Sequence, residues 1–201
     1  MAAAGQVTTG FSLPYVALYG NSGSTITYTS GQKLARGVSV SVAPETSDDN
    51  NFYTDNIVAE TEAGKFTGGE VTLTVDGLFP TAEKLILGLP TASTSGLTAY
   101  GDSQVIPYVG IGFIVRRQSE GVVGYQAVIL PKAIFSLPNT DANTQEETID
   151  WQTQELSATC LRDDSTARAW KYVGTDYTTE AAAEAALQTK LNYTPTPIIT
   201  T

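Results

Sequence analysis

The sequence contains no histidine, and among its 201 residues it has only one cysteine and one methionine. Without histidine, the chain cannot build Ser-His-Asp or Cys-His catalytic arrangements or the commonest zinc sites. The single Cys160 cannot close an internal disulfide. Because Cys160 lies in a strand-like run, we expect it to be buried as a small apolar side chain. These absences exclude histidine-based catalysis, the usual zinc sites and redox sites that need a pair of cysteines.

Long apolar runs are also missing. No stretch approaches the roughly 20 apolar residues that a membrane-spanning helix needs. Residues 1–10 are small and polar, and they lack the basic start and apolar stretch of a signal peptide. We therefore expect no membrane partner and a chain that is made and kept in a cytoplasm-like compartment.

Charged residues are scarce at 16%, and acids outnumber bases so that the formal net charge is −10. Nucleic-acid binding needs Lys and Arg to replace the counterions of the phosphate backbone. A surface of this kind would let DNA pass without holding it. Charge alone favours the plainer alternative, an ordinary soluble acidic protein.

Paired carboxylates are the acid–base chemistry that remains. The candidate pairs lie in or beside turn-like segments, where solvated acids are ordinary; they are Glu60 with Glu62, Glu146 with Glu147, and Asp163 with Asp164. An acidic run at 48–51 is similar to the start of a calcium loop, but aromatic residues follow where further oxygen ligands are needed. We therefore expect no enzyme, no metal and no cofactor.

Thr, Ser, Gly and Tyr are abundant, and this composition favours strands and turns over long helices. Val71, Leu73 and Val75 alternate with threonines, and over 38–43 valines alternate with small residues. A period of two places each set on one buried face of a strand. Large aromatics dominate buried area in β proteins. The predicted core includes Val40, Val71, Leu73, Phe113, Tyr125, Trp151 and Trp170.

The clearest hairpin is predicted for 109–117 and 121–132, with its turn at 119–121. Two helices are also expected. The first spans Thr81–Leu89, with Thr81 as its N-cap, and the second spans Thr179–Leu191, with a narrow apolar stripe of Ala183, Leu187 and Leu191. We predict one mainly β domain over 1–201, with an N-terminal arm at 1–10 and a C-terminal arm at 192–201.

Residues 44–69 have little clear periodicity. Structureless loops longer than roughly 12–15 residues are uncommon in compact domains, and those that exist are usually functional or disordered. Aromatic residues give this segment apolar anchors that a disordered linker does not need. We interpret it as a loop or long hairpin ordered against a neighbouring molecule; a mobile surface loop is the alternative. The predicted contact residues are Asp48, Asp49, Phe52, Tyr53 and Phe66.

Four sequence motifs follow one another along the second half of the chain. PYVGIGFIVRR at 107–117 is followed by GYQAVILPK at 124–132, and then by ETIDWQT at 147–153 and LSAT at 156–159. The chain resembles the major tail proteins of long-tailed, siphovirus-type phages, in which such strands recur in this order. The resemblance covers nearly the whole chain and is sharpest over 107–160.

The resemblance implies an antiparallel β sandwich or barrel-like domain with flanking helices, without catalysis. Six copies would close into a ring, and rings would stack into the tail tube of a virion assembled in the host cytoplasm. The partners implied are further copies, a tape measure protein, tail terminator and baseplate proteins, and double-stranded DNA passing through the lumen. Two other classes stay open, a receptor- or glycan-binding β module of the virion and an acid–base hydrolase that uses Glu146 or Glu147.

Overall fold

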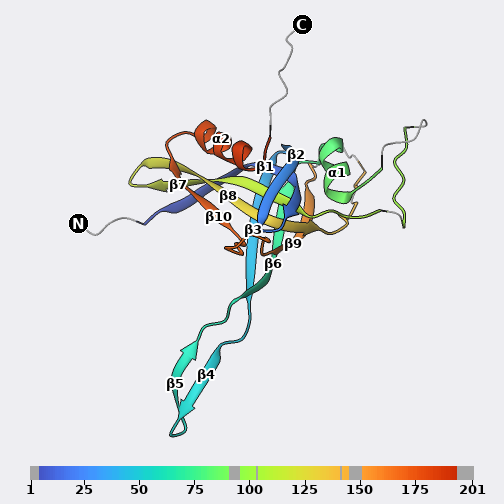
Figure 1. Cartoon of the computed structure of the whole chain (residues 1–201). Helices are drawn as coiled ribbons and strands as arrows, with labels where there is room; N and C mark the ends of the chain where they lie inside the picture. Colours follow the sequence, from blue (N-terminus) through green and yellow to red (C-terminus); the bar gives the residue numbers. More distant parts are fainter. Residues whose placement is uncertain (1–4, 91–95, 103, 141, 145–150, 194–201) are drawn as a thin grey trace.

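Antiparallel strands make up most of the molecule in a computed structural model that describes residues 5–90, 96–102, 104–140, 142–144 and 151–193 (Figure 1). The main sheet has the order β2-β1-β7-β8-β9-β6-β3, and β10 pairs with β8. Its strands are β1 (Val7–Ser22), β2 (Thr25–Lys33), β3 (Gly37–Thr46), β6 (Phe66–Val75), β7 (Val109–Ser119), β8 (Val122–Phe135), β9 (Gln154–Leu161) and β10 (Tyr172–Tyr177).

The sheet forks along β8, and the fork produces two layers. The first half of β8 pairs with β10 at 125–129, whereas its second half pairs with β9 at 132–135. The far ends of the sheet also approach each other, because Phe11 of β1 lies over Gly37 of β3, where an added Cβ would come within 2.2 Å of the ring. The predicted mainly β, antiparallel, sandwich-like fold is confirmed.

Two apolar clusters lie on opposite faces of the sheet. The larger cluster contains Leu73, Phe113 and Leu130 together with helix α1 (Pro80–Leu87). The smaller one lies under helix α2 (Glu180–Lys190), whose Leu187 and Leu191 sit over the glycines of β7. The alternation of side chains along the strands of the β7–β8 hairpin accounts for this division, since Phe113 faces one cluster while Tyr125 packs against the other.

The turn of that hairpin is formed by Glu120 and Gly121, which have φ angles of 49° and 83°. Positive φ at both central residues suits the twist of the flanking strands. The predicted hairpin is therefore confirmed, and it extends from Val109 to Phe135.

Both helices are present, with different caps. Thr179 caps α2 by accepting a hydrogen bond from the amide of Ala182 at 3.3 Å, and the predicted apolar stripe is buried. Thr81 is not the cap of α1, which starts at Pro80 after Phe79 and has no side-chain cap. The ring of Pro80 fixes φ in the helical range, so the helix begins one residue earlier than expected.

Most of the predicted core is buried. Val71, Leu73 and Phe113 are buried, as is the free Cys160, and Val40 and Tyr125 are half-buried against the clusters. Trp170 is half-buried outside both clusters.

Two predictions of burial are wrong. Trp151 is 85% exposed, because β9 begins only at Gln154 and Trp151 precedes the strand. Val38 is exposed as well, since a register shift between Gly37 and Ser39 leaves it unpaired at the start of β3.

The chain ends differ from the predicted arms. Residues from Val7 onward belong to β1 and pair with β7, so the proposed N-terminal arm is at least partly a strand. At the other end Tyr193 packs edge-on against Tyr15, with ring centroids 5.2 Å apart, and residues 194–201 lie outside the described part of the chain. Within the described residues no helix is both long and apolar enough to cross a membrane.

Candidate assembly surface

A long hairpin projects from the body of the molecule as a continuation of β3 and β6 (Figure 1). It consists of β4 (Asn50–Thr54) and β5 (Ile57–Glu62), which pair with each other and with no other described strand. We call residues 47–65 the arm. Its turn residues Asp55 and Asn56 have φ angles of 50° and 65°, a pair of values that suits a two-residue hairpin turn. The predicted loop or long hairpin at 44–69 is therefore a hairpin.

Polar contacts brace the arm where it leaves the body. Asp49 accepts a hydrogen bond from the amide of Gly64 at 2.8 Å, and Ser47 accepts one from the amide of Lys65 at 3.0 Å. Asp49 thus holds the two strands of the arm together, and Asp48 stands exposed beside it.

The arm has no core of its own. Phe52 and Tyr53 are 62% and 61% exposed, and Ile57 and Val58 on the opposite strand are exposed too. Successive residues of a strand point to opposite faces, so each face of the hairpin carries one of the two aromatic rings. An isolated two-stranded hairpin is marginally stable in water. The exposed rings therefore provide apolar area that a partner can cover.

Phe66 behaves differently from the other predicted contact residues. Its ring stacks on Trp170 with centroids 4.6 Å apart and an interplanar angle of 9°, and the Arg162 guanidinium lies 5.9 Å from its centroid on the same chain. In this structure Phe66 thus packs within its own chain, and its contact with a neighbouring copy stays a prediction. Phe66 begins β6, and its side chain anchors the base of the arm to the body.

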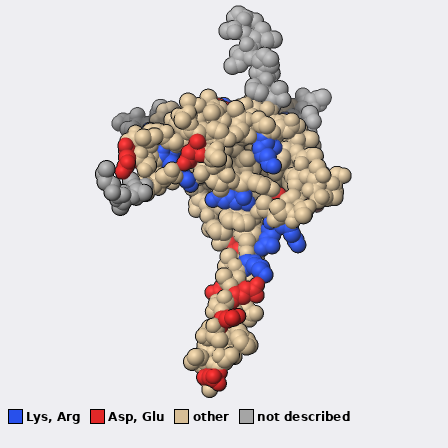
Figure 2. Space-filling view, turned by 60° about the vertical axis from the view of Figure 1, so that its left-hand side comes forward, with Lys and Arg blue, Asp and Glu red and all other residues tan. Residues whose placement is uncertain are grey.

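Charge is unevenly distributed between arm and body. The arm carries five acidic residues and one lysine, which leave a formal charge of −4. Figure 2 shows these acids along the arm and basic side chains gathered where the arm leaves the body. Lys65 binds Glu62 at 2.9 Å, and this hydrogen bond lowers the pKa of Glu62. The arm is therefore an acidic rod with exposed aromatic rings.

Three strands of the main sheet have an edge without a strand partner among the described residues: β2, β3 and β10. Such edges expose N–H and C=O groups that can pair with another chain. They extend the candidate assembly surface beyond the arm.

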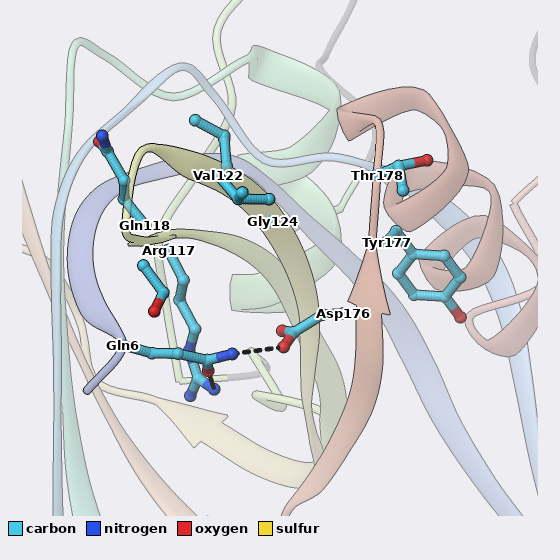
Figure 3. Close-up of a pocket in the computed structure, with 10 residues that line it drawn as sticks. Gln6, Arg117, Gln118, Val122, Gly124, Asp176, Tyr177 and Thr178 are labelled. Atoms are coloured by element: carbon cyan, nitrogen blue, oxygen red, sulfur yellow. Dashed lines mark hydrogen bonds between the residues drawn. The ribbon is translucent and has the colours of Figure 1, made fainter. Parts of the chain in front are cut away.

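A shallow groove of about 170 Å³ lies at the tip of the β7–β8 hairpin (Figure 3). Gln6 bridges its walls, since it donates to Asp176 at 2.9 Å and accepts from Arg117 at 3.2 Å. Small-molecule sites usually measure about 300–1,000 Å³. The groove is smaller, and its charged groups are engaged with one another through Gln6.

The carboxylate pairs do not form a catalytic arrangement in the described residues. Glu60 and Glu62 lie on the exposed arm, and Glu146 and Glu147 fall outside the described part of the chain. Asp163 is buried, with Ser165 and Tyr172 donating to it at 2.6 and 2.8 Å, whereas Asp164 binds Lys132 at 2.8 Å.

Nor does a metal centre appear in that part of the chain, because no group of three or more acidic or Cys ligands converges there.

Comparison with known proteins gives no assignment. No family model matches the sequence, and no curated protein matches it. Functional inference therefore depends on the geometry of the arm and the sheet edges, together with the resemblance in sequence.

Proposed function

We propose that this chain is the major tail protein of a long-tailed phage, a structural subunit that forms six-membered rings stacking into a tail tube. The observation that carries the proposal is the arm, a hairpin that leaves the body and exposes Phe52 and Tyr53 to solvent. An extended strand rises about 3.4 Å per residue, so the arm extends well clear of the body and can present its rings to a neighbouring subunit.

The mode of association follows from the shape of the subunit. The arm and the body have different surfaces. A contact between the arm of one copy and the body of another therefore joins two unlike surfaces. Such head-to-tail contacts produce a ring when the rotation closes and a filament when it does not. A tube needs one contact of each kind, and the arm and the free strand edges supply two candidate surfaces.

The composition supports passage of DNA through such a tube. With a net charge of −10 per subunit, tubes would repel a phosphate backbone rather than bind it. Tape measure, tail terminator and baseplate proteins are the further partners proposed, in a virion tail assembled in the host cytoplasm. No catalytic step and no cofactor form part of this proposal.

Deletion of residues 48–62 tests the proposal. The body should remain folded, because β4 and β5 pair only with each other in the described structure, whereas stacking into tubes should be lost. Circular dichroism checks the fold, and negative-stain microscopy with sedimentation measures rings and tubes.

A milder variant serves as the matched comparison. Phe52→Thr with Tyr53→Thr keeps the strand propensity of the arm and removes only its exposed rings. It should reduce tube formation and leave the monomer unchanged. Unmodified protein that stays monomeric under every condition tried would refute the proposed function, and normal tubes after the deletion would remove the arm from it.

A further inference from the structure

The base of the arm carries a group of basic side chains beside an aromatic stack, and one of them, Arg162, donates a hydrogen bond to the backbone carbonyl of Phe66. Arg162 lies over the ring of Phe66, Trp170 stacks on the same ring, and the Lys171 ammonium lies 5.8 Å from the centroid of Trp170. Cations and rings therefore belong to one continuous cluster. Arg168 belongs to the same loop between β9 and β10. We call Arg162, Arg168, Trp170 and Lys171 the collar.

The loop that carries the collar is held in a tight conformation. The amide of Asp163 donates to the carbonyl of Ala169 at 2.8 Å, and the amide of Arg168 donates to the carbonyl of Ser165 at 3.0 Å. These bonds fold residues 163–169 back on themselves. Arg168 is thereby presented from a folded turn and not from a long extended loop.

The acids of the same loop make their hydrogen bonds with residues outside the collar. Asp163 is 2% exposed and accepts hydrogen bonds from Ser165 and Tyr172, while Asp164 binds Lys132 and accepts from Tyr19 at 2.8 Å. The hydrogen bond from Lys132 is the main cause of the lowered pKa of Asp164, and the charge of Arg168 adds a smaller part. Among the described residues no salt bridge involves Arg162, Arg168 or Lys171. The collar is therefore a local positive patch on a protein whose net charge is strongly negative.

The arm has the complementary properties: a formal charge of −4, exposed carboxylates such as Asp48 and Glu60, and exposed aromatic rings. Cations and rings attract each other, and opposite charges steer two surfaces into register. The arm of the same chain forms no ion pair with the collar among the described residues. We infer that the collar is the docking surface for the acidic arm of a second copy of this chain.

This inference rests on the proposed function, and it identifies the surface of the neighbouring subunit to which the arm binds. The arm of one subunit would lie against the collar of its neighbour, with arm carboxylates facing Arg168 and Lys171 and with an arm ring beside Trp170. A phosphate-bearing partner at the collar is the competing outcome, and the experiment separates it from the arm.

Charge reversal in two separate variants provides the test. Arg168→Glu with Lys171→Glu reverses the collar, and Asp48→Lys with Glu60→Lys reverses the arm without touching the brace made by Asp49. Each variant alone should lose polymer in sedimentation and negative-stain assays. An equal mixture of the two should regain it, because the reversed arm then fits the reversed collar and each unmodified arm fits an unmodified collar.

A matched control changes the net charge equally at other sites. Lys84→Glu with Lys190→Glu alters one half-buried and one exposed lysine on the two helices and should leave polymer formation as in the unmodified protein. Circular dichroism confirms the fold of every variant.

The outcomes discriminate clearly. Polymer formed normally by the collar variant, or no recovery in the mixture, would overturn the pairing of arm and collar. Binding of a double-stranded oligonucleotide to the unmodified collar in place of the arm would also overturn it. Absence of polymer from the unmodified protein would instead refute the proposed function itself.

Discussion

Three tyrosines of β1 and β2 have phenol groups withdrawn from water. Burial raises the pKa of Tyr19 to about 12, and it raises the pKa values of Tyr15 and Tyr28 further. Hydrogen bonds hold these hydroxyls in place: Tyr15 donates to Glu184 of α2, and Tyr28 donates to the carbonyl of Pro131 at 2.9 Å. The neutral phenol is the form that the fold accommodates.

These raised pKa values predict a loss of stability in alkali. A tyrosine whose pKa is higher in the folded state contributes stability that is fully present below about pH 10, the ordinary tyrosine pKa, and is lost as the pH rises through the folded pKa. The free energy of unfolding should therefore fall from about pH 10 upward. Urea titrations at several pH values, followed by circular dichroism, measure this slope.

Tyr28→Phe should make that slope shallower. It also leaves the Pro131 carbonyl without its donor, so it should lower stability at pH 7 by about 1–3 kcal/mol. Tyr53→Phe is the control, because this tyrosine lies on the arm and is 61% exposed. An unchanged slope in Tyr28→Phe would contradict the account.

At the scale of elements, the end of α1 depends on one glycine. Gly88 has a φ of 61°, and its amide bonds back to the carbonyl of Lys84. An added Cβ would also lie 2.0 Å from the carbonyl oxygen of Val105. The residue therefore serves both as a left-handed helix cap and as a point of close backbone approach.

Gly88→Ala should destabilise the protein by more than about 1 kcal/mol, because alanine disfavours this φ and collides with the neighbouring carbonyl. Urea unfolding provides the measurement. Gly101→Ala is the matched control, since an added Cβ there meets no atom within 4 Å. Equal stability of both variants would show that the cap geometry is not needed.

Much of this element-level structure could be predicted from the sequence. The alternation around Leu73 gave the correct buried face, because a period of two leaves little choice for a strand with one face inside. Trp151 was placed wrongly because its size suggests burial while the chain only later enters β9. Size alone does not distinguish a core tryptophan from one placed outside the sheet.

The candidate site was less predictable than the fold. Phe52 and Tyr53 are predicted as contact residues because the surrounding segment lacks periodicity; the structure shows that they are exposed, and the contact itself stays a prediction. The collar could not be predicted from the sequence, because acids separate its members along the chain. The side chains of these acids turn toward Ser165, Tyr172 and Lys132. Only the folded loop shows that Arg168 and Lys171 remain exposed. A stretch of mixed charge in the sequence does not show which of its charged side chains are exposed.

On the scale of the whole molecule, the subunit has a body with two apolar clusters and an arm with none. The free energy needed to open the arm should be small, because few buried apolar contacts resist it. In a polymer the same segment would be covered by a neighbour. Order in the arm is therefore expected to depend on assembly.

Hydrogen exchange measures this difference directly. In dissociated subunits, amides of β4 and β5 should exchange much faster than those of β6 and β7, and in tubes they should become protected. The strands of the body act as the internal reference in both states. Equal exchange of the arm before and after polymerisation would contradict its role as a contact.

The direct continuity of the arm with β3 and β6 has a mechanical consequence. If a neighbour grips the arm, tension enters the body along the strand direction. There, β6 is flanked by β3 on one side and by β9 on the other over Gly69–Val75. Because the arm pulls β3 and β6 in the same direction, the bonds between these two strands stay largely unloaded, whereas the β6–β9 ladder bonds are sheared together instead of unzipped one by one. In a polymer of such subunits, stretching would load the pairing of β6 with β9 in shear.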